Sequence, residues 1–196
     1  MLNTYLPNNF NTEEVLQLLK IHDCRLTITP PRKTKLGDFK INIVGYPNPI
    51  ITINNNLNKF AFAVTLLHEI AHLLVWINNK NYLKLKPHGY EWKKEFKALL
   101  VKHIRDFPTD IQDALLLYMQ NPKASSCTDS NLKKTLQNYN AKNNLLLVEN
   151  IEIGSLFILN GRTFKKGSLL RKHYKCLELA SKKEYRVHAL AEVEIL

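Results

Sequence analysis

The chain has 196 residues, 45% of them hydrophobic, and a formal net charge of +11 at pH 7. This composition excludes a disordered or fibrous protein, and the length suits one domain with at most a small second unit. The three cysteines, Cys24, Cys127 and Cys176, are odd in number and far apart, which argues against a secreted disulfide framework. We therefore expect a reducing, cytoplasmic setting and a core that does not depend on disulfides.

No secretory leader is expected, because residues 1–10 have neither a basic segment nor an apolar run. The apolar stretch 60–77 has the composition of a membrane span, but it contains His68, Glu69 and His72. Such ionisable groups would cost roughly 2.5–3.5 kcal/mol each in a bilayer. We therefore expect a buried helix in a protein that has no membrane partner.

The first 120 residues predict helices and short strands. Asn11 or Thr12 can cap a first helix that runs to about Ile21. Alternating apolar residues predict strands at 25–29, 39–44 and 50–53. Further helices are predicted at 59–78, 90–105 and 109–120.

The remainder changes character at residue 121. Residues 121–144 are rich in Asn, Ser and Lys, which predicts a basic polar linker. Beyond it, Asn160-Gly161 between the segments 157–159 and 162–164 predicts a β-hairpin, and 169–177 and 185–193 predict more strands. The expected organisation is a domain over 1–120, the linker over 121–144 and a β-rich module over 145–196.

The positive charge is densest in the third quarter of the chain. Residues 121–175 hold ten basic and three acidic residues, a net charge of +7. Such a block can attract a polyanion such as nucleic acid. A solvated surface that aids solubility is the competing interpretation.

Residues 68–72 read His-Glu-Ile-Ala-His, an HExxH motif in the middle of the apolar stretch. Residues four apart share one face of a helix, so His68 and His72 can point at one metal ion. Glu69 lies beside them and can take a proton from water and later give it to a leaving amine. A pair of structural histidines is the alternative. The apolar flanks favour a metal, because ionisable groups inside a buried helix need partners.

Two histidines leave a tetrahedral zinc site short of one protein ligand. A metzincin-type arrangement needs Gly at position 75 and His at position 78, where this chain has Val75 and Asn78. A carboxylate of the next helix, Glu91 or Glu95, could complete the site, and so could His88 at the mouth of that helix. The residues alone leave these choices open.

At this point the sequence resembles a known family. The run HEIAHLLVWINNKNYLKLKPHGYEWKKEF is similar to the SprT-like metalloproteases, which include bacterial SprT proteins and the eukaryotic Spartan proteases that act on DNA–protein crosslinks. The shared pattern is HExxH, an apolar helix end, a short loop, and HG before an aromatic residue on a helix. The resemblance covers Arg32 to about His103.

The resemblance implies roles for particular residues. It makes one Zn²⁺ ion the cofactor, with His68, His72 and His88 as its ligands and Glu69 as the general base. It leaves Glu91 and Glu95 in surface or helix-capping roles. It also implies that the strand before the metal helix, 50–53, lines the cleft and binds an extended protein substrate by strand addition.

The C-terminal part departs from the family pattern. SprT-like proteins often end in a zinc ribbon with two cysteine pairs, whereas Cys176 stands alone here and cannot build a four-ligand site. We interpret 145–196 as a ribbon-like module in which apolar contacts replace the metal, with Phe157 and Phe164 in its core. The residues predicted to contact DNA are Arg162, Lys165, Lys166, Arg171, Lys172 and Lys175.

The sequence thus predicts an α+β protein with a zincin-like metalloprotease domain and a small C-terminal β module that resembles a zinc ribbon without its cysteines. The expected activity is zinc-dependent cleavage of DNA-associated or DNA-crosslinked proteins by a monomer in the cytoplasm, including at the nucleoid. Single-stranded or protein-crosslinked DNA is the expected partner. The alternatives are a DNA-binding adaptor with a structural or silent zinc site, and a peptidase unrelated to DNA.

Overall fold

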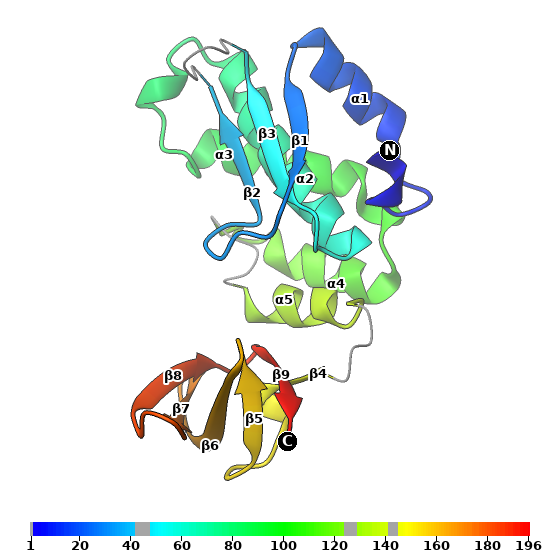
Figure 1. The fold of residues 1–196 in the computed structure, drawn as a ribbon. Coiled ribbons are helices and arrows are strands. Elements are labelled where there is room, and N and C mark those ends of the chain that lie inside the picture. Colours follow the sequence, from blue (N-terminus) through cyan, green and yellow to red (C-terminus); the bar gives the residue numbers. More distant parts are fainter. Residues whose placement is uncertain (1, 42–47, 124–128, 141–144) are drawn as a thin grey trace. The chain divides into compact units, whose positions relative to one another are not determined.

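The computed structural model describes residues 2–41, 48–123, 129–140 and 145–196 (Figure 1). The chain divides into two compact units, Met1–Asn140 and Ala141–Leu196. The described residues form a small mixed sheet, five α-helices and a six-stranded antiparallel sheet. At this level the predicted α+β class is confirmed.

The sheet of the first unit has three strands in the order β1-β3-β2. The central strand is β3 (Ile50–Asn54), which pairs in parallel with β1 (Arg25–Thr29) and antiparallel with β2 (Gly37–Lys40). The strand predicted at 39–44 therefore begins earlier, at Gly37, and residues 42–44 lie outside the described part of the chain. As a result, β2 forms one edge of this sheet.

The helices of the first unit follow the predicted pattern closely. Asn11 caps α1 (Thr12–Ile21) by accepting a hydrogen bond from the backbone N–H of Glu14. The others are α2 (Lys59–Asn78), α3 (Tyr90–Lys102), α4 (Thr109–Tyr118) and α5 (Ser130–Gln137). Short 3₁₀ turns lie at Leu2–Thr4 (η1), Tyr82–Lys84 (η2) and Ile104–Asp106 (η3).

Helix α2 is the centre of this unit. It packs against α3 and against strands β2 and β3. By length and composition it could cross a membrane, but most of it is buried inside the protein. Its apolar side chains form one core with Ile51, Ile53 and Phe96, which are fully buried. This packing explains why the stretch is apolar on nearly every side.

Helix α5 lies within the segment predicted as a linker. Asp129 caps it by accepting a hydrogen bond from the N–H of Leu132, and Leu132 and Leu136 are buried in the core of the first unit. The amide of Asn58 donates to the carbonyl of Leu136 at 2.8 Å, which ties α5 to the start of α2. The first compact unit therefore extends to Asn140 rather than to residue 120.

The second unit is a six-stranded antiparallel sheet in the order β4-β9-β5-β6-β7-β8. Strands β5 to β8 form a meander, and β9 returns to pair with β5 and β4. A turn of 3₁₀ helix, η5 (Val148–Asn150), follows the first strand. The strands are β4 (Leu145–Leu147), β5 (Leu156–Leu159), β6 (Arg162–Leu170), β7 (His173–Glu178), β8 (Glu184–His188) and β9 (Glu192–Ile195).

The predicted hairpin at Asn160-Gly161 is confirmed, since both residues have positive φ and join β5 to β6. Two predicted strands are wrong in extent. The run 169–177 is broken by a turn at Arg171, which has a φ of 53°, and 185–193 is broken between β8 and β9. Arg171 and Lys172 lie in exposed backbone between β6 and β7, so neither is a strand residue.

Candidate metal centre

Helix α2 sets the positions of His68, Glu69 and His72. The side chain of Asn58 caps its N-terminus by accepting from the N–H groups of Phe60 and Ala61 at 3.1 and 2.9 Å. With the helix fixed in this way, the four-residue spacing places both imidazoles on one face. That face lies toward α3.

His88 comes from the turn that precedes α3. Gly89 is the N-cap of α3, and its N–H donates to the carbonyl of Lys86 at 2.9 Å. A Cβ atom at Gly89 would lie only 3.0 Å from that carbonyl oxygen, so the tight turn favours glycine. Trp92, in the first turn of α3, donates from its indole N–H to the carbonyl of His68 at 3.3 Å. The turn and this bond bring His88 over α2.

Three imidazole nitrogens converge at one point. The Nε2 atom of His88 lies 3.1 Å from the Nε2 atoms of both His68 and His72, and the donor atoms all lie within 4.8 Å of one another. Nitrogens that bind one tetrahedral zinc ion at roughly 2.0–2.1 Å would be about 3.3 Å apart. The donor set and its spacing therefore fit a metal ion, with one position left for another ligand.

Burial keeps these imidazoles in the neutral form that binds metals. Together with neighbouring histidines, it lowers the pKa of His68 to about 2 and that of His72 to about 3. The pKa of His88 is also lowered by burial. The free protein therefore presents three neutral imidazoles at neutral pH.

We expect the affinity for Zn²⁺ to change less than about fivefold between pH 7.5 and pH 6.0. A site loses affinity as the pH falls through the pKa of its ligands. Here the pKa values of His68 and His72 lie below this window, and that of His88 is lowered by burial. Three exposed histidines with pKa near 6.5 would instead weaken by about 50-fold. Competition with a chromophoric chelator, corrected for its own protonation, measures this. A steep loss of affinity by pH 6.0 would contradict the expectation.

Glu69 is the buried carboxyl group next to the histidines, with 6% of its surface exposed. Burial and, to a smaller extent, the nearby charge of Asp38 raise its pKa to about 8, against the opposing charges of Arg32 and Lys35. The backbone of β2 passes very close to it. A Cβ atom at Gly37 would lie 2.5 Å from Oε1 of Glu69 and 2.8 Å from Cγ2 of Thr65.

A loop held by Arg32 and Asn54 brings β2 to this position. The guanidinium of Arg32 donates to Oδ1 of Asn54 and to the hydroxyl of Thr52, both at 2.8 Å. The amide of Asn54 donates back to the carbonyl of Lys35 at 2.9 Å. These bonds fix the chain between β1 and β2, which forms one wall beside Glu69.

The histidines and Glu69 open into a cleft of about 420 Å³. The cleft is lined by residues 34–39 of the loop and β2, by Thr65, His68, Glu69 and His72 of α2, and by Tyr82, Pro87 and His88. The strand expected at the cleft from the sequence was 50–53, and this expectation is wrong. Strand β3 is paired on both sides, whereas β2 is the edge strand that lines the cleft.

Glu91 and Glu95 do not join the histidines. Within the described ranges, the group of metal-binding side chains comprises the three histidines alone, and neither glutamate lines the cleft. Of the alternatives that the residues left open, His88 is the one that the structure brings to the HExxH pair.

These features define the class of the protein: an α+β protein whose HExxH helix and a third histidine form a site that could hold a metal ion. Residues 20–113 match the SprT-like family. The match begins before β1 and ends inside α4, so it includes the sheet, the histidines and Glu69.

Similarity to individual relatives is confined to a shorter segment. Protein SprT of Enterobacter sp. (strain 638) is 41% identical over 54 residues, which are 27% of this chain and 29% of that protein. Protein SprT of Salmonella newport (strain SL254) is 40% identical over 53 residues, again 27% of this chain and 29% of that protein. The match thus spans less than a third of either relative. No solved structure matches the chain.

Lys166, predicted to contact DNA, is inside the second unit. It is 4% exposed, and its ammonium donates to the carbonyl of Ile151 at 2.5 Å and lies 3.9 Å from the ring centre of Tyr174. The prediction failed because alternation places Lys166 on the same face of β6 as Phe164, which is in the core. Lys166 therefore cannot take part in a surface for DNA.

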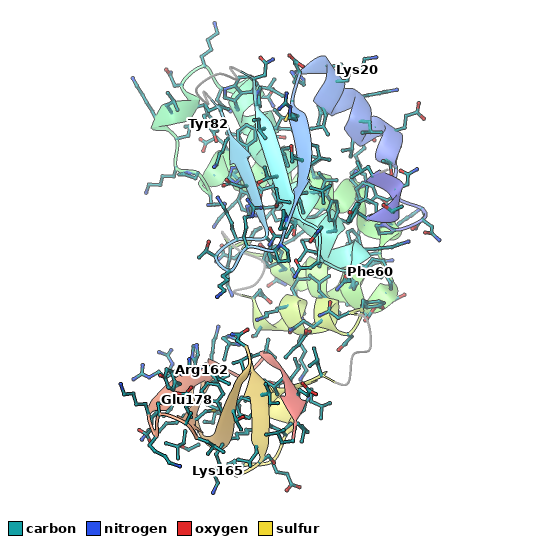
Figure 2. All side chains as sticks on the ribbon, in the orientation of Figure 1. Lys20, Phe60, Tyr82, Arg162, Lys165 and Glu178 are labelled. Atoms are coloured by element: carbon teal, nitrogen blue, oxygen red, sulfur yellow. The ribbon has the colours of Figure 1, made fainter. Side chains whose placement is uncertain are left out.

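The other residues predicted to contact DNA are exposed, and two of them form ion pairs. Arg162 forms an ion pair with Glu178 and lies 4.4 Å from the ring centre of Tyr185 (Figure 2). Lys175 pairs with Glu184 at 2.8 Å. Lys165, Arg171 and Lys172 are also exposed. Sequence reasoning missed Arg186, which lies opposite Lys175 in the β7–β8 register. Its two-residue spacing from Glu184 and His188 places all three side chains on one face of β8, and this pattern could have identified it.

Substitution of the neighbouring residues Lys165 and Lys166 should affect the stability of the protein to very different extents. Lys166→Ala would leave the buried carbonyl of Ile151 without its donor, so we expect a loss of about 1–3 kcal/mol in the free energy of unfolding. Lys165→Ala removes an exposed side chain and should change it by less than about 0.5 kcal/mol. Hydrogen exchange of the β6 and β7 amides in the full chain measures both. Equal protection in the two variants would contradict the assignment.

Proposed function

We propose that this protein is a zinc-dependent metalloendopeptidase with a zincin-like catalytic domain. The observation that carries the proposal is the convergence of His68, His72 and His88 on one point, with the buried carboxyl of Glu69 on the same helix. A purely structural zinc site has four protein ligands. Here three ligands face a cleft, which favours catalysis over a structural role.

A zinc ion held by the three histidines would supply Lewis-acid chemistry, because it polarises a peptide carbonyl and acidifies water. Glu69 accepts a proton from the attacking water while the new C–O bond forms. It then gives that proton to the leaving nitrogen as the C–N bond breaks. Because its pKa is raised, the ionised carboxylate of Glu69 is a stronger base toward water than an exposed glutamate would be.

The protein substrate would bind as an extended segment along β2. This strand lines the cleft, and within the described residues only one of its edges is paired, with β3. Its free backbone groups can add a strand of substrate. Gly37, beside Glu69, lets that strand lie directly next to the carboxyl group.

DNA-associated protein is the substrate class that we propose. The support is the exposed outer face of β6–β8, where Lys165, Lys175 and Arg186 carry positive charge. Cations on one face of a sheet can contact phosphates without reading sequence. The module itself we interpret as ribbon-like but filled by apolar side chains. Cys176 is fully buried among them on β7.

A zinc-loaded cleavage assay on a DNA-bound protein tests the proposal. We expect cleavage that chelation abolishes and zinc restores, with one zinc ion per chain by metal analysis. Cleavage that single-stranded DNA and salt leave unchanged would favour a peptidase unrelated to DNA. DNA binding without cleavage of any protein would favour the adaptor. Two zinc ions per chain would contradict the metal-free module.

A further inference from the structure

The cleft offers few groups that could stabilise negative charge on a substrate oxygen. Among the described residues that line it, and apart from the histidines, four side chains carry an O–H or N–H donor: Thr34, Lys35, Thr65 and Tyr82. When water adds to a peptide bond, charge develops on the carbonyl oxygen, and a positioned donor there is worth far more than one in water. The choice among these four decides which residue can assist the reaction.

Three of the four donors are poorly suited. The hydroxyl of Thr65 already donates to the carbonyl of Ala61 at 2.8 Å, within its own helix. The ammonium of Lys35 is paired with Asp38 at 2.7 Å. Thr34 is exposed, so water competes for its hydrogen bond. Tyr82 remains as the donor of the cleft.

Tyr82 is held in a short, internally bonded turn after α2. Its N–H donates to the carbonyl of Asn79 at 3.1 Å, and its carbonyl accepts from Leu85 at 3.0 Å. The side chain of Asn79 donates to the carbonyl of Val75 at 2.8 Å, which ties the turn to the end of α2. The bonds fix the backbone from which the Tyr82 ring extends (Figure 2).

The ring of Tyr82 packs toward the metal centre. It meets the ring of Phe39 edge to face at 6.3 Å, and Phe39 stacks on His72 at 6.2 Å. Burial raises the pKa of the phenol, and the charge of Glu69, which lines the same cleft, raises it too. The phenol therefore stays protonated and able to donate.

We propose that Tyr82 is a further catalytic residue, whose hydroxyl donates a hydrogen bond to the carbonyl oxygen of the scissile peptide as negative charge develops there. This inference rests on the proposed peptidase function. The hydroxyl keeps its proton throughout, because the protons of the reaction pass from water to Glu69 and on to the leaving nitrogen. Since the bond strengthens as charge develops, it should act on kcat and leave KM nearly unchanged.

Tyr82→Phe, which keeps the ring and removes the hydroxyl, tests the role on dye-labelled casein as the probe substrate. We expect kcat to fall roughly 100-fold, with KM changed less than about threefold. Tyr90→Phe is the matched control, because Tyr90 is 78% exposed and does not line the cleft. Zinc content and thermal unfolding should be the same in all three proteins.

A second measurement does not depend on turnover. A phosphinic peptide built on a casein cleavage site, mapped by mass spectrometry, mimics the tetrahedral geometry of the reaction. Calorimetry should give weaker binding of it to Tyr82→Phe, by about the same factor as kcat. If Tyr82→Phe keeps the wild-type kcat and the wild-type affinity for the phosphinic peptide, the role of Tyr82 is overturned but the proposed function is not. Absence of cleavage by the wild-type protein would overturn the proposed function and this inference with it.

Discussion

Glu69→Gln is expected to abolish proteolysis while leaving the metal in place. The amide has nearly the same shape as the carboxyl group but cannot accept a proton from water, so kcat should fall by about 10²–10⁴-fold. The three histidines are unchanged, so one zinc ion per chain should still bind. Cleavage is measured by release of labelled peptides, and zinc by atomic absorption after gel filtration.

Glu95→Gln is the matched control for this variant. Glu95 lies on α3, was a candidate ligand from the sequence, and does not line the cleft. Its substitution should change neither zinc content nor kcat. Undiminished cleavage by Glu69→Gln would overturn its role as the base. Loss of zinc from that variant would mean that Glu69 holds the metal site together instead.

Trp92→Ala is expected to be the most destabilising single change near the site. Trp92 is 1% exposed, and its ring centre lies 4.6 Å from that of His68 and 4.7 Å from that of His88. Truncation leaves a large cavity and removes the bond to the carbonyl of His68, so the free energy of unfolding should fall by about 3–5 kcal/mol. Urea unfolding followed by far-ultraviolet circular dichroism measures the loss.

The same variant should also weaken zinc binding, because the rings of His68 and His88 lose the wall that orients them. Zinc stabilises the folded protein in proportion to its affinity, so the gain in Tm on adding zinc should shrink in Trp92→Ala. Trp92→Phe fills most of the space and should retain most of this gain. A full zinc-dependent gain in Trp92→Ala would show that Trp92 supports the core but not the metal centre.

The sequence correctly predicted those parts of the fold that are determined by residues close together along the chain. Helix α2 was predicted with the bounds that it has, because the apolar run that forms it is continuous in the sequence. The three histidines came from the same source, since HExxH fixes a helical spacing and the family pattern supplies His88. The metal centre was therefore largely predictable.

Three of the failures concern contacts between distant segments. Helix α5 has only Leu132 and Leu136 to mark it, and its position depends on Asn58, more than seventy residues away. Which strand forms the edge of the sheet depends on the pairing of β2 with β3, which alternation cannot reveal. Lys166 reads as a surface charge until the carbonyl of Ile151 is found beside it. In each case the residue or strand that determines the structure lies far away along the chain, so neighbouring residues do not reveal it.

The contact between Gly37 and Glu69 restricts which residues position 37 can accept. A methyl group there would lie within 3 Å of Oε1 and Cγ of Glu69 and of Cγ2 of Thr65, so β2 or both side chains of α2 would have to shift. A side chain at position 37 should therefore displace the carboxyl group from the cleft while the HExxH motif itself stays intact. Activity in this protein thus depends on a glycine that lies outside the motif.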